Sequence, residues 1–273
     1  MGRTPVWGAG APAPWAVGLT LALGASFALF GPQPSPRGAA LQRATSQATP
    51  PYDGRFTFAR VRYGGGGRGG FELGRRGGGA DAWAHDYPAA DLNMQVVLKE
   101  ITTVDPVIGT SVIVDLEDPA LFRHPLLYMS EPGFWSITLE GAKNLRAHLL
   151  KGGFIIFDDF DGPGHWESWL AQSERALPEY QPIEIGPTHP VFQTYFKVAD
   201  IYVPNPMVQG LPRPTYFGIF EDNDPSGRMM ALVNYNSDLA EYWEWSTSGY
   251  LPIDPTNDAY RLGVNYFIYG LTH

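Results

Sequence analysis

Cysteine is absent from this chain of 273 residues. The absence excludes thiol nucleophiles, zinc–thiolate sites, disulfides and a lipid-modified N-terminal cysteine. It does not decide the compartment, because an exported protein can fold without disulfides.

Basic residues are scarce. The chain has 19 lysines and arginines against 28 aspartates and glutamates, a formal net charge of −9. The first 50 residues hold three arginines and no acid, so the remainder carries −12. An acidic body repels phosphate backbones, which argues against nucleic acid as a partner.

Long apolar runs are also scarce, but one uncharged run lies near the N-terminus at residues 15–30. It is shorter than the roughly 20 residues of a membrane-spanning helix. We expect a signal peptide or an N-terminal anchor over residues 1–31, with a buried helix as the remaining alternative. Residues 32–51, rich in Pro, Ala, Ser and Thr, are typical of a linker. The expected location is therefore exported, periplasmic or at the cell envelope, with membrane contact only through the N-terminal segment.

Glycine and arginine dominate residues 64–80. The pattern G-x-G-x-x-G occurs there at Gly64, Gly66 and Gly69, but a dinucleotide site needs a tight strand–turn–helix. We interpret the segment as an insertion within a domain spanning residues 52–273.

Strand and helix patterns alternate through that domain. Helical spacing is found at Leu92, Val96, Val97 and Ile101, after a start at Asp86 and Pro88 with Asp86 as the capping residue. Expected strands are 55–63, 111–116, 125–130, 154–157, 182–185, 215–220 and 229–235, and further helices are 138–153, 165–177 and 257–271. Short connections between alternating strands and helices predict an α/β fold: a flavodoxin-like, doubly wound, mostly parallel sheet in a single domain.

Ligands of open α/β sheets bind outside the carboxyl ends of the strands. Three loops leave such ends, after Tyr63, Met129 and Phe157. In a 2-1-3-4-5 strand order these strands are neighbours, so the loops converge. The candidate ligand-binding residues at this edge are Tyr63, Ser130, Glu131, Asp158 and Asp161.

The run "DDFDGPGH" at 158–165 carries the candidate chemistry. Its aspartates could hold a divalent metal, cap the next helix or bind another ligand, and we favour capping by Asp159 and Asp161. Neighbouring strand residues point to opposite faces, so Asp158 and Asp159 should diverge. Asp159 and His165 are the candidate catalytic acid/base pair, and His85, after the Gly/Arg-rich segment, is a further candidate at the same edge.

Two other features carry weaker signals. Ser130 stands where a nucleophile could, but G-x-S-x-G is absent and Pro132 makes a strained turn a poor fit. The aromatics Tyr242, Trp243 and Trp245 could stack on a sugar, but covering a sheet end is favoured.

The order of several motifs resembles the bacterial family known as domain of unknown function 4159. The matching stretches are "FARVRY" (58–63), Trp83, "LEDPALFRHPLLYMS" (116–130), "LRAHLLKGGFIIFDD" (145–159), "HPVF" (189–192), "SGR" (226–228) and "AYRLGVNYFIYGLT" (259–272). The resemblance implies a sheet like that of class I glutamine amidotransferase domains. It implies no activity, because those enzymes use a cysteine nucleophile. It also implies an assembly role beside a cell-envelope protein partner.

Two functions follow as expectations. The favoured one is an exported, non-catalytic domain that binds a ligand or a protein partner at the cell envelope. The alternative is a hydrolase of a carbohydrate or a cell-envelope ester or amide, in which Asp159 and His165 act with or without a divalent metal. No cofactor is assigned by the sequence.

Overall fold

The computed structural model describes residues 53–65, 81–198 and 200–273. The expected signal or anchor, the linker and most of the Gly/Arg-rich insertion lie outside these residues. Two compact units are distinguished, residues 1–35 and 36–273, and everything below concerns the second. No helix among the described residues is both long and apolar enough to cross a membrane.

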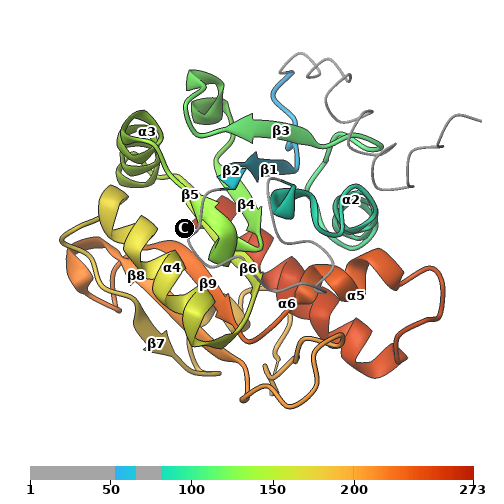
Figure 1. Cartoon of the computed structure of the whole chain (residues 1–273). Coiled ribbons are helices and arrows are strands. Elements are labelled where there is room, and N and C mark those ends of the chain that lie inside the picture. Colours follow the sequence, from blue (N-terminus) through green and yellow to red (C-terminus); the bar gives the residue numbers. More distant parts are fainter. Residues whose placement is uncertain (1–52, 66–80, 199) are drawn as a thin grey trace, which may run out of the picture. The chain divides into compact units, whose positions relative to one another are not determined.

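The described residues form an α/β fold around one mixed sheet of seven strands (Figure 1). The sheet order is β3-β1-β4-β6-β9-β8-β7. The strands are β1 (Ala59–Arg62), β3 (Val112–Asp115), β4 (Leu126–Ser130), β6 (Phe154–Phe160), β7 (Ile183–Ile185), β8 (Thr215–Phe220) and β9 (Met229–Tyr235). Strands β3, β1, β4, β6 and β9 are parallel, whereas β8 runs antiparallel to both β9 and β7. As expected, β1, β4 and β6 are neighbours, so their carboxyl ends meet.

Helices cover both faces of the sheet, as Figure 1 shows. Helices α2 (Ala89–Ile101), α5 (Leu239–Trp245) and α6 (Ile253–Thr272) share one apolar core with one face. Helices α3 (Leu139–Leu150) and α4 (Gly162–Ala176) share a second core with the other face. Strands covered on both sides explain the continuous apolar runs in the sequence.

Short elements connect these layers. The two-residue strands β2 (Gly64–Gly65) and β5 (Trp135–Ser136) pair antiparallel, so the Gly/Arg-rich segment leaves β1 through a small ribbon. The 3-10 helices are η1 (Ala82–Ala84), η2 (Pro119–Arg123), η3 (Pro132–Phe134), η4 (Pro190–Phe192) and η5 (Glu221–Asn223).

Helix α3 forms as its sequence indicates. The Thr138 side chain accepts a hydrogen bond from the Gly141 amide, and Glu140 lies in the first turn, where the helix dipole favours an acid. Gly152 then takes a left-handed conformation with φ of 103° and ends the helix.

Helix α2 differs from expectation in the face that it buries. Val96 and Ile101 are 48% and 41% exposed, whereas Met94 and Leu98 are fully buried. Asp91 is also fully buried, because it pairs with Arg60 beneath the helix with the two side chains 0% exposed. The face of α2 that carries Asp91 and its partner Arg60 is therefore buried, and the face that carries Val96 and Ile101 is exposed.

Candidate metal centre

The carboxyl ends of β1 and β4 are tied together by Tyr63. Its hydroxyl donates to the carbonyl oxygens of Ser130 (2.9 Å) and Glu131 (2.6 Å). The structure thus brings together three of the sequence-predicted edge residues.

Strand β6 runs three residues further than expected, through Asp158 and Asp159 to Phe160. Its pairing with β9 shifts register between Phe157 and Phe160, and Asp159 has a φ of 64°. Such an irregularity re-aims side chains at a strand end. The prediction that the strand ends at Phe157 is wrong, because pairing with β9 resumes at Phe160 after the irregularity, so Asp158 and Asp159 lie within β6.

Asp158 is a buried carboxylate whose oxygens are taken by protein donors. Tyr128 donates to it at 2.8 Å, Asn234 at 2.9 Å and the Leu239 amide at 3.1 Å. Burial raises the pKa of Asp158 to about 7, although these hydrogen bonds oppose the rise. Asp158 therefore joins β4, β6, β9 and α5, and it does not face the ligand edge.

Asp159 points elsewhere, as the strand alternation predicted. Its Oδ2 lies 2.6 Å from Nδ1 of His85 and accepts from the Ser130 hydroxyl at 3.2 Å. A carboxylate that holds one ring nitrogen fixes the tautomer and leaves the other nitrogen for a metal. His85 Nε2 faces Glu241 Oε2 at 3.9 Å.

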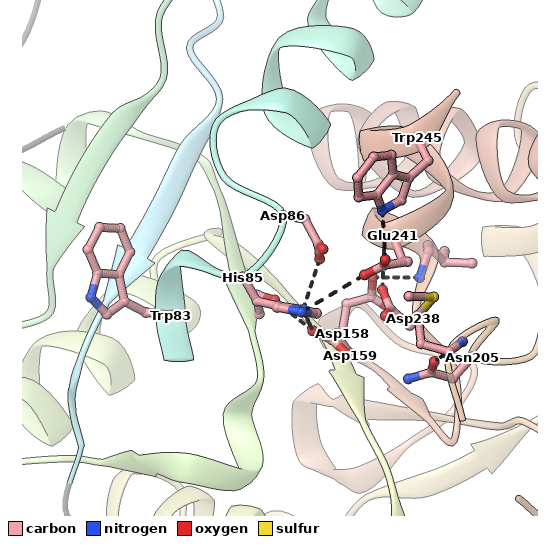
Figure 2. A network of polar contacts seen from close by, with 12 residues as sticks. Trp83, His85, Asp86, Asp158, Asp159, Asn205, Asp238, Glu241 and Trp245 are labelled. Atoms are coloured by element: carbon pink, nitrogen blue, oxygen red, sulfur yellow. Dashed lines mark hydrogen bonds and ion pairs between the residues drawn. The ribbon is translucent and has the colours of Figure 1, made fainter. Parts of the chain in front are cut away.

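Two sets of potential metal ligands meet at His85, and Figure 2 shows His85 with Asp86, Asp159, Asp238 and Glu241 around it. The first set is His85, Asp86, Asp238 and Glu241, and the second is His85, Glu131 and Asp159. Within each set the ligand atoms lie within 4.8 Å of one another. We call these six residues the carboxylate–histidine centre. Its members come from the segment before α2, the ends of β4 and β6, and the start of α5.

Asp86 and Asp238 carry buried oxygens that accept no hydrogen bond. Both oxygens of Asp86 and Oδ2 of Asp238 are of this kind, and the two residues are each 1% exposed. Buried polar atoms are nearly always satisfied, and an unsatisfied carboxylate is costly. Figure 2 shows both side chains turned toward the interior of the centre.

Three members of the centre have strained backbones. Asp86, Glu131 and Asp159 have φ values of 61°, 50° and 64°. Left-handed conformations are uncommon outside glycine, and such strain collects at functional sites. The strained residue after β4 is Glu131, whose carbonyl Tyr63 holds, and not Ser130, so the poor fit of a nucleophile elbow at Ser130 stays a prediction.

The electrostatics of the centre reflect crowded carboxylates. Burial is the first cause that raises the pKa of Glu131, Asp159 and Asp238, and it combines with Asp86 to raise that of Glu241 to about 8. For His85, burial lowers the pKa, but Asp159 and Asp86 outweigh it and the pKa is raised. Without a metal, the negative charge of the centre is therefore reduced by protons on the carboxyl groups and by the positive charge of protonated His85.

Folding stability without metal is expected to fall as the pH rises from about 6 to about 8.5. Folded Asp158 and Glu241 keep their protons to about 7 and about 8, whereas unfolded carboxyls ionise near pH 4, roughly. The folded chain therefore binds more protons than the unfolded chain, so stability decreases with pH. The raised pKa of His85 acts in the same direction, because its contribution is complete below about pH 6.5 and is lost above it.

Urea unfolding in a chelator at the two pH values measures this effect. The loss should be about 4 kcal/mol before the contribution of His85, since Asp158 keeps its proton to about 7 and Glu241 to about 8, and each pH unit with one proton of difference is worth about 1.4 kcal/mol. A free energy of unfolding that stays constant or rises would contradict the assigned protonation states.

The capping role favoured for the aspartates is wrong. Asp161 occupies the N-cap position of α4 without a side-chain capping hydrogen bond, and Asp159 binds His85 and Ser130. The expected capping by Asp86 is also wrong, because α2 follows Pro88 with no side-chain cap. Asp86 and Asp159 belong to the centre instead.

The other candidate residues have definite places. His165 lies on α4, and its ring centre is 4.5 Å from that of Phe134. The histidine that contacts Asp159 through a hydrogen bond is His85. The pairing of Asp159 with His165 stays a prediction. Tyr242 and Trp243 are buried, at 3% and 1%, whereas Trp245 is 36% exposed and its indole nitrogen donates to Glu241 at 2.7 Å.

The sequence interpretation missed three members of the centre: Asp86, Asp238 and Glu241. Asp238 accepts a hydrogen bond from the Glu241 amide at 2.9 Å, so D-x-x-E is a helix start. The D-x-x-E pattern before the aromatic run is the sequence signal that could have identified Asp238 and Glu241. The same pattern is expected at any capped helix start, so it does not show whether these acids also bind a cation.

Comparison with known proteins identifies one family. Residues 57–271 match the family model described as "Domain of unknown function (DUF4159)". No curated protein matches the chain.

Proposed function

This chain belongs to the DUF4159 family, and we propose that its α/β domain binds a divalent cation in the carboxylate–histidine centre and uses it for hydrolysis. The observation that carries the proposal is the meeting of six potential ligands at one sheet edge, two of them with buried oxygens that accept no hydrogen bond.

The donor chemistry supports a cation. His85 Nε2 is free to bind a metal because Asp159 holds Nδ1, and Asp86, Asp238 and Glu241 supply carboxylate oxygens. Imidazole suits zinc, iron and related metals, and carboxylates suit magnesium, calcium and manganese. This mixture favours Mn²⁺ or Zn²⁺ over a purely oxygen-bound cation.

The energetics of burial support it too. Asp86, Asp159, Asp238 and Glu241 are at most 3% exposed, with one imidazole among them. Gathering ionised carboxylates away from water is unfavourable without compensating positive charge. Arg60 supplies little of it, because its guanidinium pairs with Asp91 and its effect on Asp86 is smaller than that of His85.

A divalent cation is expected to stabilise the full-length protein against thermal unfolding. At 100 times its dissociation constant, a ligand adds about 2.7 kcal/mol, which raises the Tm by about 5–10 °C. Mn²⁺, Zn²⁺, Mg²⁺ and Ca²⁺ would each be added after treatment with a chelator. The Glu241→Gln variant should lose the shift. Asp161→Asn is the matched control, because it removes a neighbouring acid outside both ligand sets and keeps a residue favoured at an N-cap.

Absence of any shift in the wild-type protein, or equal shifts in Glu241→Gln and the control, would overturn the cation proposal.

Hydrolysis is tested on the same samples with nitrophenyl esters of acetate and of phosphate. A bound cation polarises a carbonyl or phosphoryl group and lowers the pKa of water. Cation binding without turnover of either ester would leave a non-catalytic binding domain, the function that the sequence alone favours.

Export to the cell envelope and a protein partner there remain proposals. The export proposal rests on the apolar run at 15–30, which lies outside the described residues, and the partner proposal rests on the family resemblance.

A further inference from the structure

Two adjoining aromatic side chains lie exposed next to the carboxylate–histidine centre. Trp245 is the last residue of α5 and is 36% exposed, and Tyr250 lies in the connection to α6 and is 62% exposed. Among the described tryptophans, Trp245 is the most exposed. Single exposed aromatics are common, but an adjoining pair with the polar residues 246–248 beside it is typical of a binding surface.

A hydrogen bond connects Trp245 to the centre. Its indole nitrogen donates to Glu241 Oε1 at 2.7 Å, and Figure 2 shows the ring next to Glu241 with this nitrogen directed at it. Glu241 is also one of the potential metal ligands. The polar edge of the indole therefore faces the centre, so a molecule that lies on Trp245 has one end at the centre.

Hydrogen bonds within the loop hold the two rings in place. Ser248 donates to the Trp245 carbonyl from its amide at 3.0 Å and from its hydroxyl at 2.7 Å. The same hydroxyl accepts from the Tyr250 amide at 3.1 Å. The ring centroids of Trp245 and Tyr250 are 5.2 Å apart. A surface that is ordered before binding loses little conformational freedom when a ligand arrives.

The geometry and the charge of this surface select its ligand. The two rings contact each other at an interplanar angle of 53°, so they leave no gap between them for an ammonium group and form a platform and not a cage. The net charge of −9 disfavours anionic ligands. A neutral ring with apolar faces and hydroxyl groups at its rim matches an aromatic platform beside carboxylate acceptors. A pyranose sugar has this form.

We propose that Trp245 and Tyr250 form a carbohydrate-binding subsite next to the carboxylate–histidine centre, and that the substrate of the centre carries a sugar ring. The apolar face of the sugar stacks on the two aromatic rings, and the bond to be hydrolysed extends toward Glu241. The role of this sugar as substrate rests on the hydrolysis proposed above, whereas its stacking on the rings does not require the cation.

Titration of the full-length protein with neutral oligosaccharides tests the inference. Cellotetraose, maltotetraose and chitotetraose would each be added up to millimolar concentrations, once with Mn²⁺ and once with a chelator. Binding is followed by tryptophan fluorescence and by calorimetry. At least one sugar should bind in both conditions. Trp245→Ala and Tyr250→Ala should each weaken that binding by about 10-fold or more, as is typical when a stacking ring is removed.

Two further variants serve as controls. Trp245→Phe keeps a ring but loses the indole N–H, so it should bind the sugar nearly as well as the wild-type protein. Phe122→Ala removes a ring that is 42% exposed and lies 5.2 Å from the Lys151 ammonium, at the end of α3. That position precedes the amino end of β6, whereas the centre lies at the carboxyl end, so sugar binding should not change.

The possible results separate this inference from the proposed function. No binding of any of the three sugars, or equal affinities in Phe122→Ala and both alanine variants of the platform, overturns the subsite. Equal losses in Trp245→Ala and Trp245→Phe overturn the stacking and make Trp245 a positioning residue for Glu241. Sugar binding by a protein that binds no cation supports the subsite and overturns the proposed function. If Trp245→Ala fails to fold, the more exposed Tyr250→Ala still decides the question.

Discussion

Replacing Arg60 with methionine is expected to destabilise the protein by about 3–5 kcal/mol, which is typical when one partner of a buried ion pair is removed. The Arg60 and Asp91 side chains are both 0% exposed, with Arg60 Nη2 2.5 Å from Asp91 Oδ1. Methionine leaves the carboxylate of Asp91 buried without its counter-ion. Denaturant unfolding measures the loss.

The same substitution should weaken cation binding. Arg60 donates to the carbonyl oxygens of Trp83 (3.2 Å) and His85 (2.9 Å), so it holds the segment that carries His85 and Asp86. Arg60 acts through that backbone and is a positioning residue. In samples that remain folded, the Mn²⁺ dissociation constant should increase.

Arg62 on the same strand is the matched control. It pairs with Asp115, but the two side chains are 38% and 39% exposed. Exposed pairs contribute about 0–1 kcal/mol, so Arg62→Met should be nearly neutral. A double variant, Arg60→Met with Asp91→Leu, should recover much of the lost stability, because it also removes the carboxylate that Arg60→Met leaves buried without a counter-ion. Equal effects of Arg60→Met and Arg62→Met would contradict this account.

Replacing Asp238 with asparagine is expected to have opposite effects on stability and on cation binding. Asparagine keeps the side-chain oxygen that accepts from the Glu241 amide, so the start of α5 is preserved. It removes a carboxylate whose pKa is raised first by burial and then by Asp159 and Asp86. The metal-free protein should therefore gain on the order of 1 kcal/mol, since a buried like charge is lost.

Cation affinity should fall by at least about 100-fold in the same variant, equivalent to about 2.7 kcal/mol. Unfolding in a chelator and calorimetric titration with Mn²⁺ give the two quantities. Asp161→Asn should change neither by much. If Asp238→Asn destabilised the metal-free protein and left the affinity intact, Asp238 would be a capping residue and not a ligand.

Much of the fold follows from local sequence patterns. The continuous apolar run 154–157 predicts a strand covered on both faces, and it lies within β6 between two apolar cores. Thr138, Glu140 and Gly152 predict the start and end of α3 because capping and dipole effects are local. The helix at α5 was missed, since its aromatic and acidic residues show no apolar face.

The buried face of α2 could not be predicted from apolar spacing. Asp91 is hidden under the helix by its pairing with Arg60, a residue on a strand distant in sequence. Hydrophobic periodicity assumes that polar residues face water, and this ion pair violates the assumption.

The α/β class, the neighbouring strand ends and the divergence of Asp158 from Asp159 can be predicted from the sequence, because they depend on strand alternation and on chain connectivity. Which acids form the centre depends on contacts between segments that are distant along the chain. His85 and Asp86 precede α2, and Asp238 and Glu241 begin α5, and no spacing along the chain relates them. They meet because α2 and α5 pack on the same face of the sheet, so the segment before α2 and the start of α5 lie together where β4 and β6 end.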